Sequence, residues 1–450
     1  MGEFDLVLES ATGLRVARYR PEAGTLVWAD DGTALVTPSN RPASFVRHAA
    51  TSPEHPVGKS RAPRRIKLQL GLSCNFSCQY CSQSSQRPES KSEIQLSVER
   101  VDAFLAELSS WFDGGDDGQG SGVVWEFWGG ETLIYWRALA TLADALTARY
   151  PHIRLALFTN GSLLRPSMAA DFARWRLHVV ISHDGARFTE DRGRDPLLDE
   201  AQRAAIATVF AALAPARLVS FNATLSWQNY SLRAIRRFIA DKLAVAEAEV
   251  RLTWDLATPY DEAGKRYVAS PDMARRLVNE LFFEWQSSYP HELELGDLGQ
   301  ELQRFFAGLS EQRPVSTLAQ KCGMDRPEAL ALDLTGAVLT CQNVAAEKGH
   351  RIGEVKNLDE VRLSTAYHFT QRAECQRCPL VALCRGACMF LTGDLWRLAC
   401  QQHFIWNSAK LALALFLQTQ HRLVAIRAPQ GVRFADTLEV GVLFPQGERA

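Results

Sequence analysis

Short apolar runs alternate with amphipathic stretches of helical length between Arg65 and about Leu256. A run of about four to eight apolar residues is typical of a strand that is buried on both faces of a parallel sheet. The predicted strands are Ile66–Leu70, Val123–Trp128, Ile153–Phe158, Leu177–Ser182, Leu218–Thr224 and Val250–Trp254. This alternation predicts an α/β fold with helices outside a parallel sheet. In a curled, barrel-like sheet the active site would lie at the carboxyl ends of the strands.

The two ends of the chain have different patterns. Residues 1–64 begin with short alternating stretches such as Leu14–Tyr19, which predict a small β-rich extension. Thr51–Arg64 holds three prolines and has no apolar periodicity, which indicates a linker. Residues 401–419 include an apolar helical stretch around Ala409–Phe416, and strand-like alternation returns in the final thirty or so residues.

Length and composition fit a globular protein of enzyme size and exclude a disordered scaffold. The 450 residues are 46% hydrophobic and 22% charged, so the chain can bury a large core and form more than one unit. Fifty basic and fifty-one acidic residues give a net charge of -1, which provides no general attraction for nucleic acid or anionic membranes. The amino terminus lacks the pattern of a secretory signal, and no apolar run reaches the length of a membrane span. We therefore expect a cytoplasmic protein with a peptide or small-molecule substrate.

Three cysteines follow the first predicted strand as C-x3-C-x2-C: Cys74, Cys78 and Cys81. Three thiolates in one short loop can hold three irons of a cubane cluster and leave the fourth iron without a protein ligand. The alternative is a structural zinc loop, but such sites take four ligands, and no further Cys or His lies nearby. Ten cysteines in a reducing compartment are also more readily interpreted as metal ligands than as disulfides.

This loop resembles that of the radical S-adenosylmethionine (SAM) enzymes, which have the same cysteine spacing and commonly an aromatic residue before the third cysteine, here Tyr80. The resemblance implies a [4Fe–4S] cluster whose open iron is chelated by the methionyl amine and carboxylate of SAM. One electron from the cluster would then cleave SAM to a 5′-deoxyadenosyl radical. Tyr80 would lie beside the adenine. The cofactor supplies the chemistry, and the protein supplies binding and orientation.

The segment after the second predicted strand, Trp128–Thr132, resembles the Gly-Gly-Glu motif of the same family. Gly129 and Gly130 would let the backbone approach a ligand closely, and the Glu131 carboxylate could accept hydrogen bonds from the methionyl ammonium group. The family usually has proline at the position of Thr132. Gly-Gly-Glu alone would more often form a turn, and its position relative to the cysteine loop favours the functional interpretation.

Further SAM contacts are implied at the ends of the next two predicted strands. Ser182 is a candidate for the ribose or carboxylate of SAM, and either Arg192 or Arg194 could pair with the carboxylate. Asn160 and Asp184 also lie at these ends, but each precedes a glycine, and Asn-Gly and Asp-Gly are favoured in turns.

The other seven cysteines resemble the SPASM domain, a carboxyl-terminal extension of radical SAM enzymes that modify peptides and proteins. That resemblance implies two auxiliary iron–sulfur clusters. One would be bound by Cys322, Cys341 and Cys388, and the other by Cys375, Cys378, Cys384 and Cys400. The first set lacks a fourth cysteine, so its open iron could bind a substrate group, a water or a non-cysteine side chain. Alternatively, three cysteines could support a smaller cluster. Leu332–Cys341 is also predicted to be a hairpin with Gly336 at its turn.

Together these features predict a partial (β/α)6 radical SAM barrel with a SPASM domain. The expected units are a β-rich extension and linker (1–64), the barrel (65–310), the SPASM domain (311–405), and a carboxyl-terminal helix and strands (406–450). The resemblance covers residues 65–405 or so.

The implied function is maturation of a ribosomally made peptide or protein, by crosslinking or oxidising a side chain. Electrons would come from a partner such as flavodoxin or ferredoxin. A sulfatase-maturase activity that forms formylglycine is the alternative within the family, but there an aspartate base follows a SPASM cysteine, whereas Gln342 follows Cys341 here. Asp255, His183 and Tyr260 lie where a base could act, but each is more often a capping, surface or satisfied polar residue, so no catalytic residue is assigned.

A zinc-binding interaction protein and a small-molecule pathway enzyme remain alternatives.

Overall fold

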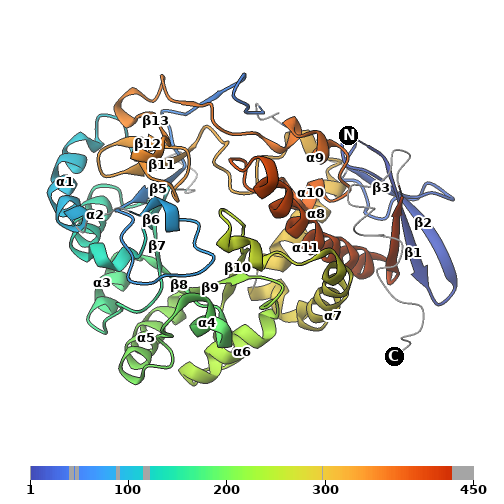
Figure 1. Cartoon of the computed structure of the whole chain (residues 1–450), viewed down its shortest axis with the longest axis horizontal. Coiled ribbons are helices and arrows are strands. Elements are labelled where there is room, and N and C mark those ends of the chain that lie inside the picture. Colours follow the sequence, from blue (N-terminus) through green and yellow to red (C-terminus); the bar gives the residue numbers. More distant parts are fainter. Residues whose placement is uncertain are drawn as a thin grey trace.

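The computed structural model describes residues 2–39, 45, 50–87, 92–114, 122–295 and 297–427. Its larger sheet contains six parallel strands in chain order (Figure 1). Each of the six predicted apolar runs overlaps one of them, so the predicted parallel sheet is confirmed. The strands are β5 (Arg65–Gln69), β6 (Val124–Trp128), β7 (Arg154–Thr159), β8 (His178–Ser182), β9 (Val219–Leu225) and β10 (Leu252–Leu256).

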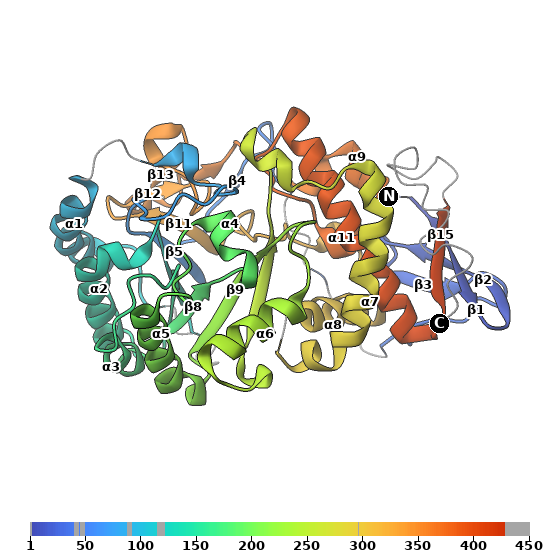
Figure 2. The ribbon, with the colours of Figure 1, turned by 60° about the horizontal axis from the view of Figure 1, so that its bottom comes forward.

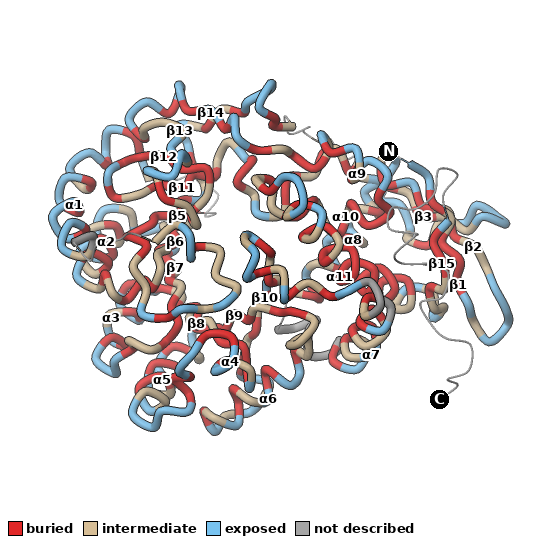
Figure 3. Tube along the Cα trace, viewed as in Figure 1, coloured by how far each residue is buried: buried red, intermediate tan, exposed pale blue. Residues whose placement is uncertain are grey.

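Helices follow the outer side of this sheet (Figure 2). They cover side chains such as Trp125 and Phe127, which have no exposed surface, and Figure 3 shows largely buried strands inside helices that are partly exposed. Local capping sets some of the boundaries, because the Asp199 carboxylate accepts a hydrogen bond from the Gln202 amide at 3.0 Å where α5 begins. The outer helices are α1 (Ser92–Leu108), α2 (Trp136–Arg149), α3 (Met168–Arg174), α5 (Glu200–Leu213) and α6 (Leu232–Leu243). The short helix α4 (Phe188–Arg192) follows β8 at the carboxyl ends of the strands instead.

A hairpin from the SPASM region extends the same sheet. It is formed by β11 (Ala329–Asp333) and β12 (Ala337–Leu339), and β13 (Arg351–Glu354) pairs with β12. Gly336 has a φ of 81° at the turn, which confirms the predicted hairpin. Strand β11 pairs in parallel with β5, so the hairpin is continuous with the sheet that carries the cysteine loop.

A second, antiparallel sheet joins the two ends of the described chain. Its order is β15 (Arg422–Arg427), β1 (Phe4–Ser10), β2 (Gly13–Arg20) and β3 (Thr25–Trp28). The predicted amino-terminal strands and a carboxyl-terminal strand are therefore present. The rest of the predicted terminal alternation, residues 428–450, lies outside the described residues.

The segment predicted to be a linker is packed instead. Strand β4 (Val57–Gly58) pairs with β14 (Arg362–Leu363), and the Thr51 hydroxyl donates to the Leu363 carbonyl at 2.8 Å. The buried Lys59 ammonium donates to three backbone carbonyls, those of Met324, Arg326 and Ala329, at 2.7 to 3.1 Å. Polar side chains thus fix this segment to the SPASM region. Because these contacts are polar, the apolar pattern of the sequence did not predict that the segment is packed.

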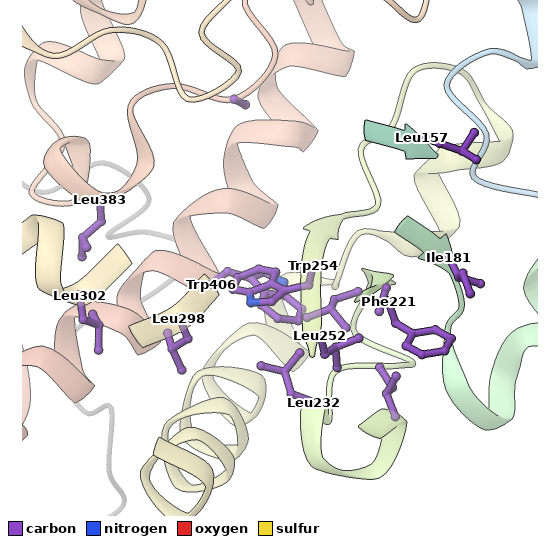
Figure 4. Close-up of a cluster of buried hydrophobic side chains, with 14 of the residues drawn as sticks. Leu157, Ile181, Phe221, Leu232, Leu252, Trp254, Leu298, Leu302, Leu383 and Trp406 are labelled. Atoms are coloured by element: carbon purple, nitrogen blue, oxygen red, sulfur yellow. The ribbon is translucent and has the colours of Figure 1, made fainter. Parts of the chain in front are cut away.

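Three long helices lie between the two sheets in Figure 1: α7 (Pro271–Leu295), α8 (Asp297–Ser310) and α11 (Gly393–Thr419). Trp254 on β10, Trp285 on α7 and Trp406 on α11 pack with ring centroids 5.7 to 6.1 Å apart (Figure 4). Helix α11 crosses the expected boundary between residues 405 and 406 as one continuous element. Among the described residues, no helix has both the length and the apolar character needed to cross a membrane. Two short helices, α9 (Ala373–Gln376) and α10 (Val381–Cys384), precede α11.

Candidate functional site

The C-x3-C-x2-C loop leaves β5 at the carboxyl edge of the parallel sheet. Cys74, Cys78 and Cys81 are half-buried free thiols that lie close enough to interact electrostatically with one another. Burial raises the pKa of Cys78 to about 11, and the Arg192 charge partly opposes this. The Arg87 guanidinium lies 3.9 Å from the Cys81 sulfur. Three neighbouring thiols with cations nearby fit the predicted SAM-binding cluster, because iron binding requires thiolates.

The Gly-Gly-Glu segment holds this loop through its backbone. The Gly130 amide donates to the Gly71 carbonyl at 3.0 Å, and the Glu131 amide donates to the Ser73 carbonyl at 2.9 Å. A Cβ atom on Gly130 would lie 2.4 Å from the carbonyl oxygens of Leu72 and Ser73. The glycines thus allow close approach to the residues just before Cys74. Contact of Gly129, Gly130 or Glu131 with SAM stays a prediction.

The Glu131 side chain ties two strand ends together. It is 1% exposed, and its carboxylate accepts hydrogen bonds from the Leu133 amide (2.9 Å), the Thr159 hydroxyl (2.6 Å) and the Asn160 amide (2.7 Å). Burial raises the pKa of Glu131, and these three donors lower it in part. Asn160 also donates to the Asn75 side chain at 2.9 Å, so the end of β7 is bonded directly to the cysteine loop.

Tyr80 belongs to a buried polar cluster with Asp184 and Arg192. The Tyr80 hydroxyl donates to Asp184, and the Arg192 guanidinium forms a bidentate pair with the same carboxylate at 2.7 and 2.8 Å. Burial alone would raise the pKa of Asp184, but Arg192 and the hydrogen bonds hold it below its usual value. Arg192 was expected to be a candidate for the SAM carboxylate, whereas its protein partner here is Asp184. The ion pair is satisfied without SAM, and it is electrostatically coupled to Cys78, the second cysteine of the loop.

The other two SAM candidates lie at the same edge of the sheet. Ser182 is half-buried at the end of β8 and stands opposite Asn222 in the ladder with β9. Arg194 is exposed just beyond α4, two residues after Arg192. Because Arg192 is paired with Asp184, Arg194 is the better placed of the two arginines to bind a carboxylate from outside.

Four SPASM cysteines line one small pocket: Cys375, Cys378, Cys384 and Cys400. They come from α9, α10, the turn between them and α11, and Trp396 and Phe404 complete the apolar wall. Burial raises the pKa of Cys378 well above its usual value, and the three neighbouring thiols raise it further. These four cysteines share one pocket, which fits the predicted four-cysteine cluster.

The remaining three cysteines, Cys322, Cys341 and Cys388, form a separate group. Cys341 follows β12, and all three thiols interact electrostatically. The surrounding protein desolvates the Cys322 thiol and raises its pKa, although the residue is exposed at the surface, and Cys341 and Cys388 contribute to that increase. Within the described part of the chain, no three His, Cys, Asp or Glu side chains form a group suited to a single metal ion. The grouping implied by the SPASM resemblance is therefore also the spatial grouping, and cluster binding itself stays a prediction.

Of the residues considered as bases, His183 is a satisfied core residue. It has no exposed surface, its Nε2 atom lies 2.9 Å from the Asp195 carboxylate, and its Nδ1 atom accepts from the Gly185 amide at 3.0 Å. Asp255 is exposed at the end of β10. Tyr260 follows β10 and is exposed, and its phenol is electrostatically coupled to Cys388, Cys341 and Cys322.

Sequence reasoning missed two residues that contribute to the site, Tyr135 and Lys67. The Tyr135 hydroxyl accepts a hydrogen bond from the Ser73 amide at 2.8 Å and so supports the cysteine loop. Lys67, on β5, is 5% exposed, donates to the Gln342 side chain at 3.2 Å and is electrostatically coupled to Cys322 and Cys341. A lysine inside a strand predicted to be buried on both faces was an available signal for Lys67. Tyr135 had none.

Comparison with known proteins identifies the fold. No protein-family model matches the chain, and no curated protein matches its sequence. The structure is similar to that of anSMEcpe with bound AdoMet and the Cp18Cys peptide: the TM-score is 0.55 at 15% identity, over 79% of this chain and 99% of that one. For anSMEcpe with AdoMet alone the TM-score is 0.53, with the same identity and coverage. Streptococcus suis SuiB bound to its precursor peptide SuiA matches with a TM-score of 0.44 at 14% identity, over 75% of this chain and 76% of SuiB.

The chain has the fold of a radical SAM enzyme with a SPASM domain. The anSMEcpe structures, which belong to an anaerobic sulfatase-maturating enzyme, are similar over nearly their whole length. The resemblance drawn from the two sets of cysteines is thereby confirmed at the level of the fold.

Proposed function

We propose that this protein is a radical SAM maturase that modifies a side chain of a peptide or protein. The observation that carries the proposal is the gathering of all ten cysteines into three groups. One of these groups lies at the carboxyl ends of the parallel strands. A zinc scaffold would not require this arrangement, because structural zinc sites are closed by four ligands.

In this proposal Cys74, Cys78 and Cys81 hold the [4Fe–4S] cluster, which supplies the electron that cleaves SAM when it is bound. The chain's own residues position the nucleoside and the amino acid of SAM. Tyr80, fixed by its hydrogen bond to Asp184, presents a ring face for the adenine. Ser182 and Arg194 are the candidates for the ribose and the carboxylate.

The two SPASM groups would hold auxiliary clusters with different roles. Cys375, Cys378, Cys384 and Cys400 would close one cluster completely, which suits electron transfer from a donor such as flavodoxin or ferredoxin. The group of Cys322, Cys341 and Cys388 faces the barrel, since Lys67 of β5 lies beside it. An electron acceptor in that position could take the electron left on a substrate radical.

The proposal is tested by SAM cleavage. The purified protein would be reconstituted anaerobically, reduced with dithionite and incubated with SAM, and 5′-deoxyadenosine would be measured. The control is a variant with Cys74, Cys78 and Cys81 all changed to Ala. We expect product from the parent and none from the variant. A fully iron-loaded parent that releases no 5′-deoxyadenosine, with or without candidate peptides, would contradict the proposal.

Formylglycine formation is the second candidate, favoured by the similarity to the peptide complex of anSMEcpe. Against it, the residue after Cys341 is Gln342, whose amide oxygen accepts from Lys67 at 3.2 Å and cannot serve as a carboxylate base. Incubation with peptides that contain a Cys or Ser target, followed by mass spectrometry, separates the two functions. An aldehyde product would establish the second candidate.

A further inference from the structure

The three-cysteine group consists of Cys322, Cys341 and Cys388, and contacts of the flanking residues gather it. The Gln320 side-chain amide donates a hydrogen bond to the Ala387 carbonyl at 2.7 Å, and both residues are buried. Residues within two positions of each cysteine also share one buried apolar cluster: Met324, Leu339 and Met389. The group is therefore held together by hydrogen bonding and packing.

Lys67 and Gln69 are two buried polar side chains on β5, each 5% exposed. Successive side chains of a strand point to opposite faces, so these two residues share one face of β5. The alternate residues, Ile66 and Leu68, belong to the apolar core. The polar face is therefore available to contact the SPASM hairpin, which extends the same sheet through the pairing of β11 with β5.

Hydrogen bonds connect this face of β5 to Cys341. The Lys67 ammonium donates to the side-chain oxygen of Gln342 at 3.2 Å, and the same oxygen accepts from the Cys341 thiol at 3.3 Å. The Gln69 side-chain amide donates to the backbone carbonyls of Gln342 and Val344, each at 2.9 Å. One oxygen atom thus separates the ammonium group from a cysteine of the three-cysteine group, and β5 holds the segment that carries this oxygen.

The Lys67 ammonium forms no ion pair with a carboxylate of the described residues. Its hydrogen-bond acceptor is a neutral amide, and the Trp128 ring lies 5.6 Å away. Glu126 is opposite Lys67 in the ladder with β6, but its carboxylate accepts from Arg65 at 2.7 Å and from the Trp128 indole at 3.0 Å. A buried charge without a counter-charge is costly, so an anion bound beside Lys67 would be stabilised there.

We propose that Lys67 is the counter-charge of an iron–sulfur cluster held by Cys322, Cys341 and Cys388, and that it raises the reduction potential of this cluster. The inference rests on the proposed function, because it requires that the group binds a cluster. Each thiolate ligand carries a negative charge, and uptake of one electron adds another. A fixed cation nearby therefore favours the reduced form, since the potential of a cluster depends on the charge around it.

The consequence concerns the direction of electron flow. In the proposed function a substrate radical is oxidised by one electron, and the cluster of the three-cysteine group is reduced by the same electron. A higher potential of the cluster makes this transfer more favourable. Lys67 acts through the cluster and forms no bond with the substrate, so it is a positioning residue and not a catalytic one.

A redox titration followed by electron paramagnetic resonance tests the proposal. The parent is the variant with Cys74, Cys78 and Cys81 changed to Ala, which leaves about eight irons in two four-iron clusters. Lys67→Met in this parent should lower one of the two midpoint potentials and leave the other unchanged. We expect a change of about tenfold in the ratio of reduced to oxidised cluster, which is about 59 mV for a one-electron couple.

Two further variants separate charge from packing. Lys67→Arg keeps the positive charge and should restore most of the parent potential. Lys356→Met is the control, because Lys356 is exposed just after β13 and the charge of an exposed group is screened by water and salt. This control should keep both parent potentials.

The outcomes separate this inference from the proposed function. Lys67→Met with both clusters and both parent potentials would overturn the role of Lys67 and leave the maturase proposal intact. If Lys67→Met loses the iron of one cluster, Lys67→Arg decides: retention of that cluster supports the counter-charge, whereas equal loss shows that Lys67 acts only through packing. A parent that binds neither iron nor sulfide would overturn both proposals.

Discussion

At the scale of single residues, the geometry of the cysteine loop depends on Gly130, because this residue has no Cβ atom. Gly130 lies where a methyl group would be 2.4 Å from two backbone oxygens of the segment before Cys74. One of these oxygens, that of Ser73, already accepts a hydrogen bond from the Glu131 amide, so it cannot move without shifting the loop. The position of the iron-binding thiols is therefore coupled directly to residue 130.

Gly130→Ala should consequently impair SAM cleavage more than folding. A misplacement of about 1 Å in a reacting group can cost roughly 100-fold in rate, and we expect a loss of that order in 5′-deoxyadenosine formation. Iron bound by the two SPASM groups should be retained. Gly308→Ala on α8 is the control, because a Cβ there meets no atom within 4 Å. Equal activities of the two variants would contradict the role given to Gly130.

A second prediction concerns the buried Asp184–Arg192 pair. Asp184→Asn leaves the Arg192 charge without its partner, and removal of one member of a buried pair costs about 3–5 kcal/mol. The pKa of Asp184 is depressed in the folded protein, so its contribution is present at neutral pH and is lost as pH falls below the usual carboxyl range. Thermal unfolding at pH 7 should show a large loss of stability, and the difference from wild type should shrink in acid.

Asp171→Asn provides the comparison, because Asp171 pairs with Arg174 at the surface and such pairs contribute about 0–1 kcal/mol. Similar melting temperatures for Asp184→Asn and Asp171→Asn would argue against a structural role for the buried pair. The cysteines of this site could be predicted from spacing, but the partner of Arg192 could not. Ion pairing between a strand end and a helix several residues away depends on how the loops fold, and the sequence pattern carries no signal for that.

At the scale of elements, the six parallel strands were predictable because each is a compact apolar run. The pairing of β11 with β5 and of β15 with β1 was not, since these partners are separated by more than 250 residues and strand patterns do not specify a distant partner. The packed segment around β4 was missed for a related reason. Its contacts are made by Thr51 and Lys59 through hydrogen bonds, which leave no hydrophobic period in the sequence.

The amino terminus of α8 leads to a prediction about pH. Burial raises the pKa of Asp297 to about 6, although its carboxylate accepts from the Trp254 amide at 3.1 Å. The folded state therefore binds more protons than the unfolded state between about pH 4 and 6, and stability falls as pH rises through that window. Asp297→Asn keeps an acceptor for Trp254 and lacks this titration. The melting temperature of the variant relative to wild type should rise from pH 5 to pH 7.5.

Asp199→Asn at the start of α5 is the matched control, because asparagine caps a helix as well as aspartate and residue 199 is exposed. Its melting temperature relative to wild type should not follow the same trend. If Asp297→Asn and wild type respond identically to pH, the carboxyl group of Asp297 does not titrate in this window.

At the scale of the whole molecule, the barrel helices and the SPASM region meet at a buried charge network. Glu301 on α8 pairs with Lys321, next to Cys322, at 3.2 Å, and with Lys410 on α11. Both ammonium groups also face the Trp254 ring, at 5.5 and 4.5 Å. One carboxylate thus connects three elements that carry or adjoin cysteines of both auxiliary groups.

Glu301→Gln should therefore loosen both auxiliary groups at once. Two largely buried ammonium groups would lose their counter-charge, at a cost of about 3–5 kcal/mol. We expect a lower melting temperature and faster release of iron to a chelator from the reconstituted protein. Glu311→Gln, an exposed change just beyond the same helix, should release iron at the wild-type rate.

If the loss of stability arises from unpaired charge, then Lys410→Met combined with Glu301→Gln should recover part of that stability, since only Lys321 would remain uncompensated. A double variant less stable than Glu301→Gln would show instead that Lys410 contributes through packing against Trp254.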